Sequence, residues 1–543
     1  MTYSEEHRYH RQLGLVDQTA VSSMKISLGG DPQLIMATLT QLACAGVGTG
    51  PKGSISICIP QKNKLGNNRH SWVFATSDKL ETWDDLTVIL KESHNINLNF
   101  SSPTKSTHVE FLRGDNFDDD ADLYATIWHG QAVLSKSPLK FNTPPNVSPS
   151  MLDASLEVAL AAATVQRLFA INGVIKENML SDTWVTLTGR VDGLMPDEAV
   201  KEYSSIHGGA TATLLPDGSG SLLRFRIPLE STPSELLKGI IHSCKMPEML
   251  SNDWLMEVGP FPLKLNEQGE VISSKLELPR QIDSANLLVL GTGGLGSWAT
   301  PLFVSGVNLE NLNISLVDAD SSVDIHNLNR QVLYTIKEVG IPKAPAAAKR
   351  LREIFGERPN ITAIQNRLEQ RHATPAIAVE ILGDYGSISL DELVGIEDVI
   401  DDEPLNEAIE NMDIALACLD NQFARTMLNK CCISNEVPMI NGGGEAFSGV
   451  VEVLNNGICM TCRYGKDAAY TQEVISCQET GTRPVASIVT TTAWVGAMQA
   501  ALALLNLAEI KGHREGMSWD CGMIHNRPVG RLPWIEGECS CHI

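Results

Sequence analysis

The stretch LLVLGTGGLGSWAT, residues 287–300, decides the fold predicted for this chain. Its first four residues predict a buried strand, and the glycine-rich turn at 291–296 leads into a helix that we expect to begin at Ser297 or Trp298. A helix that begins directly after such a turn presents unpaired backbone N–H groups, which bind phosphate. A second apolar strand, ISLV, is followed by Asp318, whose carboxylate can accept hydrogen bonds from a ribose. The stretch therefore predicts a nucleotide-binding pocket.

Length and charge limit what the chain can be. Its 543 residues suggest roughly three to four domains. A composition of 43% hydrophobic and 20% charged residues is ordinary for a globular protein. The net charge of −23 is unfavourable for binding a polyanion, so we expect no nucleic-acid partner.

The apolar segments and the cysteines indicate in which cellular compartment the protein is expected. Apolar segments such as 497–507 fall short of the roughly 20 residues needed to cross a bilayer, and the first residues lack the apolar core of a signal peptide. The twelve cysteines are scattered, which favours free thiols and metal ligands over a disulfide framework. We expect a cytoplasmic protein without a membrane partner.

The start of the chain repeats this order of elements in a degraded form. A strand at 24–28, a glycine turn, a helix at 33–45 and a strand at 54–59 follow one another. Pro32 in the turn has no N–H to offer a phosphate, and the second strand ends on an isoleucine–proline pair where the later copy has Asp318. We interpret the first copy as a repeat that has lost nucleotide binding.

Two Ala-rich segments, 151–170 and 493–507, predict long helices at comparable places in the two copies. Residues 190–275 fit neither copy. They carry a hairpin signal with its turn at 215–220 and a helix signal at 234–243.

We therefore predict an α/β protein with two Rossmann-like, doubly wound repeats and a small α+β insert. The predicted domains are a degenerate first repeat at 1–190, an insert or linker at 191–275, and an intact second repeat at 276–543.

A glycine turn of this kind would by itself suggest a dinucleotide dehydrogenase, but three further features change that interpretation. The motif NLNRQ occupies residues 327–331, Lys343 follows in GIPKA, and Asp420 and Asn421 close a predicted strand at 414–419. Cations and an aspartate at the ends of strands suit a triphosphate and Mg²⁺ better than a nicotinamide.

Together these motifs resemble the adenylating domain of the ThiF/MoeB/ubiquitin-activating-enzyme superfamily. The resemblance covers residues 281–543 and, in weakened form, residues 8–60 and the helix at 151–170. It implies one inactive and one active adenylation repeat in a single chain. One departure is a single extra residue between Asp318 and Asn327 relative to the usual pattern.

The resemblance implies a role for each motif residue in an in-line attack of a carboxylate on the α-phosphorus of ATP. Asp318 would hold the ribose, Asp420 would hold Mg²⁺, and Arg330 and Lys343 would compensate charge on the displaced pyrophosphate. The alternatives are surface charge for the two cations and a helix N-cap for Asp420. The implied nucleotide-binding residues are Gly291, Gly293, Gly294, Gly296, Asp318, Asn327, Arg330, Gln331, Lys343, Asp420 and Asn421.

The motif RYHRQ at residues 8–12 resembles a family motif whose second arginine, here Arg11, reaches into the active site of a partner subunit. The second copy has only PRQ, at 279–281, in the corresponding place. We hypothesise that the two halves form an intrachain pseudo-dimer in which Arg11 completes the second site as a catalytic residue. The alternative is that Arg11 belongs to an ordinary surface ion pair.

The pair Cys459 and Cys462 predicts a structural Zn²⁺ site together with Cys539 and either Cys541 or His542. The second pair of the family is usually CxxC, and here it is CxCH. His542 would keep the usual spacing, and Cys541, which we favour, would keep the ligand type.

Cys477 stands where sulfur-transfer members of the family carry a reactive cysteine, so it can be a catalytic nucleophile that takes over the activated acyl group. Non-transferring members also carry a cysteine there, and both interpretations stay open. Cys244, beside His242 and Lys245, is the rival nucleophile.

The resemblance implies ATP-dependent adenylation of the C-terminal glycine of a ubiquitin-like protein, then transfer to a cysteine as a thioester and onward to a conjugating enzyme. Two unequal repeats in one chain favour this function over cofactor biosynthesis. The alternatives are a peptide-tailoring or sulfur-transfer adenylase of the ThiF/MoeB type and a non-catalytic binding scaffold.

Overall fold

The fold was analysed in a computed structural model of the chain. The structure describes residues 8–58, 65, 69–70, 73, 80–96, 98–100, 106–113, 120–176, 184–192, 211–214, 220–228, 255–264, 266, 270–272, 276–368, 403–455, 458–465, 486–520, 523–526 and 529.

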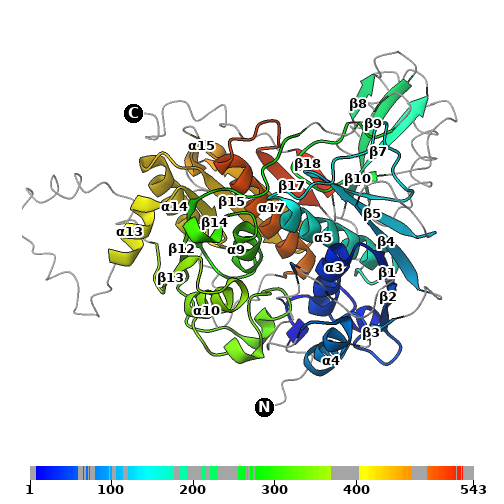
Figure 1. The fold of residues 1–543 in the computed structure, drawn as a ribbon, viewed down its shortest axis with the longest axis horizontal. Coiled ribbons are helices and arrows are strands. Elements are labelled where there is room, and N and C mark those ends of the chain that lie inside the picture. Colours follow the sequence, from blue (N-terminus) through cyan, green and yellow to red (C-terminus); the bar gives the residue numbers. More distant parts are fainter. Residues whose placement is uncertain are drawn as a thin grey trace, which may run out of the picture.

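Two mixed sheets contain the described strands, as the prediction of two Rossmann-like repeats requires (Figure 1). The first sheet has the strand order β3-β2-β1-β4-β5-β6-β10-β7-β9-β8, and the second has the order β13-β12-β11-β14-β15-β16-β17-β18. The first four strands of each order pair in parallel. The α/β fold class is therefore confirmed.

The first half follows the predicted order of elements. A glycine turn links its first strand to a helix, and a long helix comes near its end. The elements are α2 (Gln18–Ser23), β1 (Lys25–Gly30), α3 (Pro32–Ala45), β2 (Ser54–Cys58), α4 (Trp83–His94), β3 (Leu98–Asn99), β4 (Thr107–Arg113), β5 (Leu123–Trp128), β6 (Gln131–Ser135) and α5 (Asp153–Ile171).

The second half repeats this order and then adds an antiparallel run. Its elements are β11 (Ala285–Leu290), α9 (Gly296–Val304), β12 (Leu312–Val317), α10 (Lys343–Phe355), β13 (Asn360–Ile364), α13 (Glu403–Asn411), β14 (Ile414–Ala417), α14 (Gln422–Ser434), β15 (Met439–Glu445), β16 (Ser448–Leu454), α15 (Met460–Tyr464), α17 (Val489–Leu507), β17 (Gly516–Asp520) and β18 (Met523–Asn526). Short 3-10 helices lie at Leu309–Asn311, Ile325–Asn327 and Ile336–Glu338.

The described strands between the halves continue the first sheet. These are β7 (Trp184–Asp192), β8 (Thr211–Leu214), β9 (Gly220–Pro228) and β10 (Leu255–Glu257). The predicted hairpin is confirmed, because β8 and β9 pair in antiparallel register with Leu214 opposite Ser221. Strand β10 lies between β6 and β7, so these strands extend the first sheet. The helix predicted at 234–243 lies outside the described residues.

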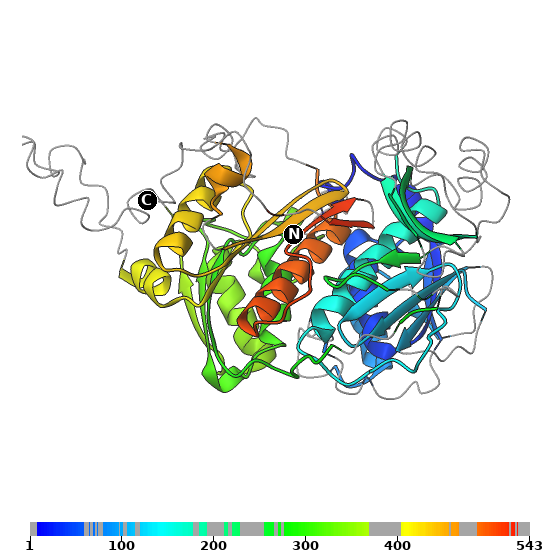
Figure 2. The ribbon, with the colours of Figure 1, turned by 90° about the horizontal axis from the view of Figure 1, so that it is seen from above.

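A layer of helices lies between the two sheets and joins the halves (Figure 2). Helix α5 contacts α3 on its own side and packs against α17, which in turn contacts α9. Buried Thr490 on α17 donates a hydrogen bond to Gln166 on α5, with 2.6 Å between the oxygens. By length and composition α5 is also the one described helix that is apolar enough to cross a membrane, but 89% of its apolar window is buried. It forms the shared core of the halves.

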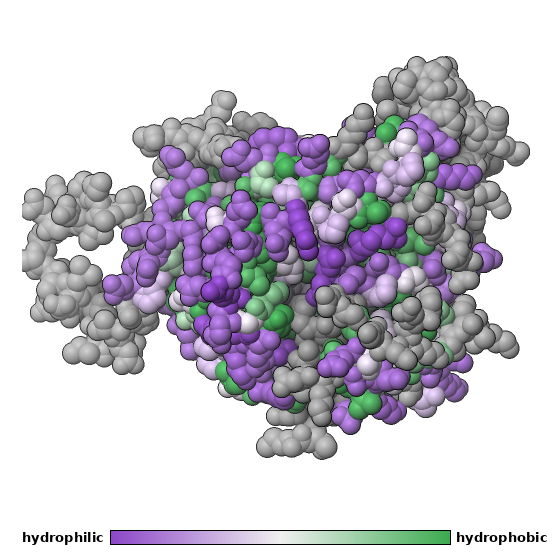
Figure 3. Space-filling view, in the orientation of Figure 1, coloured by the Kyte–Doolittle hydropathy of each residue, from purple (hydrophilic) through white to green (hydrophobic). Residues whose placement is uncertain are grey.

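A second set of contacts joins the halves at the ends of the sheets. The rings of Trp494 and Trp519 stack with 4.9 Å between centroids, and Trp494 Nε1 donates to the carbonyl of Val258. Arg514 donates to the carbonyl of Gly259 at 3.0 Å and forms a buried ion pair with Glu257. On the face shown in Figure 3, hydrophilic residues predominate over hydrophobic ones on the described surface.

We expect Arg514→Ala to destabilise the protein strongly, because it leaves the buried carboxylate of Glu257 without its cation. The free energy of unfolding, measured by urea denaturation, should fall by about 3–5 kcal/mol. Arg358→Ala is the matched control, since it breaks an exposed ion pair with Glu310 and should cost less than about 1 kcal/mol. Equal losses in the two variants would contradict a role for Arg514 in joining the halves.

Candidate nucleotide-binding site

The glycine turn between β11 and α9 leaves no room for a side chain at its first and last glycines, Gly291 and Gly296. Gly291 has φ +92°, and a Cβ atom there would lie 2.6 Å from the carbonyl oxygen of Cys418. A Cβ atom on Gly296 would lie 2.0 Å from the carbonyl oxygen of Gly291. Helix α9 begins at Gly296, one residue before the predicted start, and its N-cap residue Leu295 makes no side-chain capping bond. The N–H groups of Ser297 and Trp298 donate to the backbone carbonyls of Gly293 and Leu295 at 3.1 and 3.0 Å, so the glycine turn that precedes them is where an anion can be bound.

Asp318 is fastened to this turn. Its side chain is 8% exposed, and Oδ2 accepts hydrogen bonds from the backbone N of Thr292 at 2.7 Å and from Thr292 Oγ1 at 2.9 Å. Oδ1 accepts from the N–H of Asp320 at 2.9 Å. Burial raises the pKa of Asp318, and the charge of Lys343 opposes that shift. The carboxylate thus lies at the end of β12, beside the glycine turn, where the sequence predicts a ribose.

Tyr334 connects the turn to the beginning of α10. Its fully buried hydroxyl lies 2.8 Å from the carbonyl oxygen of Thr292, to which it donates, and 3.2 Å from the carbonyl oxygen of Lys343. The residue was not assigned a role from the sequence. A tyrosine that ends the apolar run after NRQ was the available signal, because a buried hydroxyl needs a partner.

The predicted cations are buried. Arg330 is 5% exposed, and its Nη1 donates to the carbonyl of His326 at 2.8 Å and to Asn329 Oδ1 at 2.9 Å. Lys343 is 6% exposed and forms an ion pair with Asp320. Burial excludes the alternative that these two residues are ordinary surface charges.

The neighbouring polar residues of NLNRQ are also buried. Asn327 Oδ1 accepts from the N–H of Asp324 at 2.8 Å, which closes a capping box around the 3-10 helix. Gln331 lies against Gly293, where a Cβ atom would be 3.6 Å from its Nε2. The extra residue before Asn327 is therefore accommodated in an ordered loop.

Arg11 of the first half lies near His326, in the 3-10 helix that precedes Arg330. It is 4% exposed, which excludes a surface ion pair, and its carbonyl accepts from the N–H of Ser487, just before α17. The charge of Arg11 also acts on His326 of the second half. Burial lowers the pKa of His326 to about 4, helped by the charges of Arg330 and Arg11. The structure thus brings Arg11 into the electrostatic environment of the predicted phosphate-binding residues.

Asp420 and Asn421 follow β14, next to the glycine turn. Asn421 caps α14, with Oδ1 accepting from the N–H groups of Phe423 at 2.8 Å and Ala424 at 3.2 Å. The capping role considered for Asp420 therefore belongs to Asn421. Asp420 is exposed at the carboxyl edge of the sheet. An exposed carboxylate beside a phosphate site has the right donor chemistry for Mg²⁺.

Cys459 and Cys462 lie together at the start of α15. Both are buried, and Cys459 Sγ accepts a hydrogen bond from the N–H of Cys462 at 3.3 Å. Two neighbouring thiols held on a helix turn suit two of the four ligands of a structural zinc ion. The predicted remaining ligands, Cys539 and Cys541 or His542, lie outside the described residues. Within the described ranges no three His, Cys, Asp or Glu side chains are arranged to hold a metal ion.

The candidate transfer cysteines, Cys477 and Cys244, also lie outside the described residues. Apart from Cys459 and Cys462, the cysteines that the structure describes in the second half are buried in the core, and burial raises the pKa of Cys418 to about 12 and that of Cys431 to about 11. These two are unsuited to act as nucleophiles.

Comparison with known proteins agrees with the geometry. A profile of the ThiF family matches residues 270–518. The chain is 30% identical over 186 residues to SUMO-activating enzyme subunit 2 of Dictyostelium discoideum, covering 34% of this chain and 22% of that protein. It is 28% identical over 229 residues to the molybdopterin-synthase adenylyltransferase of Haemophilus influenzae, covering 42% of this chain and 79% of that protein.

Solved structures similar to the chain include Escherichia coli MccB with MccA-N7isoASN, at 20% identity and a TM-score of 0.33. The match covers 47% of this chain and 66% of that chain. MccB with ATP matches at 21% identity with the same TM-score, over 47% of this chain and 65% of that chain.

The matched range contains every described residue of the pocket except Arg11. Residues 270–518 are therefore a ThiF family domain, which places the second half of this chain in the ThiF/MoeB/ubiquitin-activating-enzyme superfamily.

Proposed function

We propose that this protein adenylates the C-terminal glycine carboxylate of a ubiquitin-like protein with ATP and Mg²⁺. The observation that carries the proposal is the glycine turn before α9 together with the buried cations Arg330 and Lys343, with buried Arg11 of the first half acting on the neighbouring His326. Relatives named as SUMO-activating enzyme and as adenylyltransferases support an activating enzyme.

In the proposed reaction a carboxylate oxygen bonds to the α-phosphorus of ATP while the bond to pyrophosphate breaks. The N–H groups of the glycine turn before α9 and the guanidinium of Arg330 would hold phosphate oxygens. Lys343 would exchange its partner Asp320 for the departing pyrophosphate, and Arg11 would add a further positive charge. Mg²⁺, held by Asp420, would neutralise part of the triphosphate charge.

The thiolate of Cys477 or Cys244 would then attack the acyl carbon of the adenylate, forming a thioester as the bond to AMP breaks, and the acyl group would pass onward to a conjugating enzyme in the cytoplasm. The two unequal repeats favour this sequence of events. A sulfur-transfer or peptide-tailoring adenylase is the second candidate, since the molybdopterin-synthase adenylyltransferase is the relative that this chain covers most completely among those described above.

We expect a thiol-sensitive adduct when the protein is incubated with ATP, Mg²⁺ and a candidate ubiquitin-like protein. On a non-reducing gel this adduct should be lost in Cys477→Ala and retained in Cys244→Ala. The reverse result would move the transfer site to the insert. ATP–pyrophosphate exchange without any thiol adduct would contradict the transfer step and favour an adenylase of the second kind.

Arg11→Ala should slow ATP–pyrophosphate exchange by about 10²–10³-fold, because it removes one preorganised charge from the site. Arg280→Ala is the matched control. Arg280 occupies the corresponding motif position in the second copy and is exposed. Equal exchange rates in the two variants would show that the halves do not share Arg11 in catalysis.

Tyr334→Phe should lower kcat for exchange by up to about tenfold with little change in KM, since it removes the buried hydroxyl that lies between the carbonyl oxygens of Thr292 and Lys343 and holds the glycine turn beside the start of α10. In a double-mutant cycle, Lys343→Ala alone and Lys343→Ala with Tyr334→Phe should have the same rate. Additive losses would show that Tyr334 does not act through Lys343. Tyr124→Phe, which removes another buried hydroxyl in the first half, controls for general destabilisation.

A further inference from the structure

The strands beside the glycine turn of the first half, β1 and β4, correspond to β11 and β14 of the second half. In β1 and β4 Leu28 lies opposite Val109, and in β11 and β14 Leu290 lies opposite Ala417. When β1 and β4 are superimposed on β11 and β14 in this register, Arg113 at the end of β4 takes the position of Asn421, next to that of Asp420. The sign of the charge at this edge of the sheet is therefore reversed between the halves.

The first half also retains one phosphate-site arginine. The sequence Asn68-Arg69-His70 matches Asn329-Arg330-Gln331, and each lies between the second strand of its half and the following helix. Arg69 is thus the counterpart of Arg330. The first half keeps a cation at this place although its glycine turn has changed.

The helix end of the first half is capped by the protein itself. Asp31 Oδ1 accepts from the N–H groups of Gln33 at 3.0 Å and Leu34 at 3.1 Å. Pro32 has no N–H. The equivalent helix α9 has no side-chain cap: there the N–H groups of Ser297 and Trp298 donate to backbone carbonyls, whereas in the first half a carboxylate accepts from the equivalent groups.

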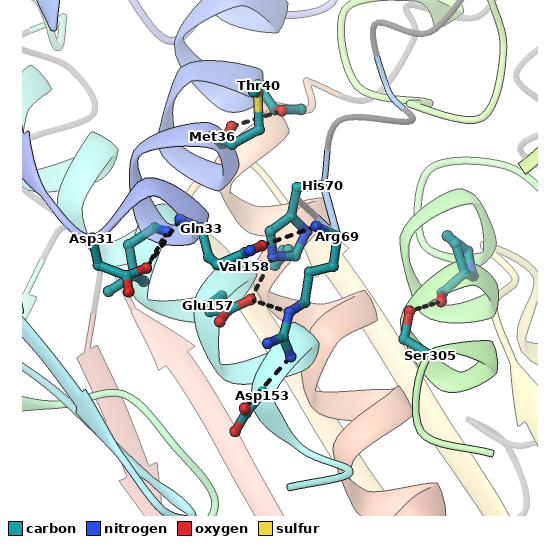
Figure 4. A network of polar contacts seen from close by, with 12 residues as sticks. Asp31, Gln33, Met36, Thr40, Arg69, His70, Asp153, Glu157, Val158 and Ser305 are labelled. Carbon is teal, nitrogen blue, oxygen red and sulfur yellow. Dashed lines mark hydrogen bonds and ion pairs between the residues drawn. The ribbon is translucent and has the colours of Figure 1, made fainter. Parts of the chain in front are cut away.

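An ion cluster surrounds this cap (Figure 4), and we call it the first-half ion cluster. Its carboxylates come from the turn and from α5, and its cations come from β4 and from the segment after β2. The members are Asp31, Arg69, His70, Arg113, Asp153 and Glu157.

One guanidinium reaches all three carboxylates of the cluster. Arg113 Nε lies 3.1 Å from Asp31 Oδ2, Nη1 lies 3.8 Å from Asp153 Oδ2, and Nη2 donates to Glu157 Oε1. Arg69 completes the arrangement, with Nη1 3.5 Å from Asp153 Oδ2 and Nε 3.4 Å from Glu157 Oε2. His70 Nε2 lies 2.7 Å from Glu157 Oε2.

The two carboxylates on α5 are buried, so water cannot easily replace their arginine partners. The side chain of Glu157 is 0% exposed and that of Asp153 is 6% exposed, whereas Asp320, the partner of Lys343 in the second half, is 33% exposed. Burial alone would raise the pKa of Glu157, but the hydrogen bond from His70 and the charges of Arg69 and Arg113 bring it below its usual value. Glu157 therefore stays ionised as a permanent partner of both arginines.

We propose that the first-half ion cluster is a phosphate-binding site occupied by the protein's own carboxylates. Carboxylate and phosphate oxygens offer arginine the same bidentate acceptors, so Asp153 and Glu157 stand in for phosphate oxygens at Arg69 and Arg113. The internal carboxylates close the first half to nucleotides. The inference does not depend on which carboxylate the second half activates.

The test is rescue by inorganic phosphate of a variant that lacks the internal carboxylates. Asp153→Ala with Glu157→Ala removes the carboxylates that face Arg69 and leaves Arg113 with Asp31 alone, so the midpoint of thermal unfolding should fall. Added phosphate should raise that midpoint by about 2–4 °C more than it does for the unmodified protein, while sodium chloride at equal ionic strength should not. Comparison with the unmodified protein removes any effect of phosphate bound in the second half.

Two further variants make the rescue specific. Adding Arg113→Ala to the double variant should abolish the phosphate effect. Glu257→Ala removes the carboxylate partner of a different buried arginine, Arg514. This variant should show no phosphate effect beyond that of the unmodified protein. If phosphate fails to stabilise the double variant, or stabilises Glu257→Ala equally, the proposal is overturned. If the double variant does not fold, Asp153→Ala alone carries the same comparison at the Nη1 atoms of Arg69 and Arg113, because Glu157 still pairs with Nε of Arg69 and Nη2 of Arg113.

Discussion

The packing of α5 against α17 is the contact on which the rest of the structure depends. Both helices are almost entirely buried, and each also packs on the sheet of its own half. An Ala-rich helix has little side-chain volume, so two such helices can approach closely and bring their two sheets into one body. The halves therefore share a core, and neither helix could keep its apolar surface covered without the other.

This packing decides what surrounds the nucleotide pocket. Ser487 stands just before α17 and binds the backbone of Arg11, so the helix that joins the halves also holds the first half's arginine near the second half's site. Within that site, Thr292 makes hydrogen bonds with both Asp318 and Tyr334. The glycine turn, the ribose position and the beginning of α10 are thus parts of one hydrogen-bonded unit.

The two halves use the same backbone frame for different electrostatic purposes. In the second half the helix end lacks a side-chain cap, and the carboxylate that pairs with Lys343 is partly open to solvent. In the first half the cap is Asp31, and the arginines are paired with carboxylates buried on α5. A buried carboxylate that has its cation cannot leave without leaving the other charge uncompensated, so this arrangement is durable.

Much of this was visible in the sequence, because strands and helices follow local periodicity and a glycine turn demands special backbone angles. The strand before Gly291, the helix after it, Asp318 at the end of β12 and the hairpin of β8 and β9 were all predicted in place. The residue that caps α14 was not predicted. Asn421 rather than Asp420 caps this helix, because two neighbouring residues of similar chemistry differ only in their backbone position.

Other features depend on residues far apart in the chain. The continuation of the first sheet by β7 and β10, the link from Tyr334 to Thr292 and the ion cluster around Arg113 are of this kind. The sequence by itself determined the elements, the family motifs and the difference between the two glycine turns. Only the tertiary structure decided which charges are buried and which carboxylate each arginine meets, because those depend on desolvation and on distances between elements that local sequence does not set.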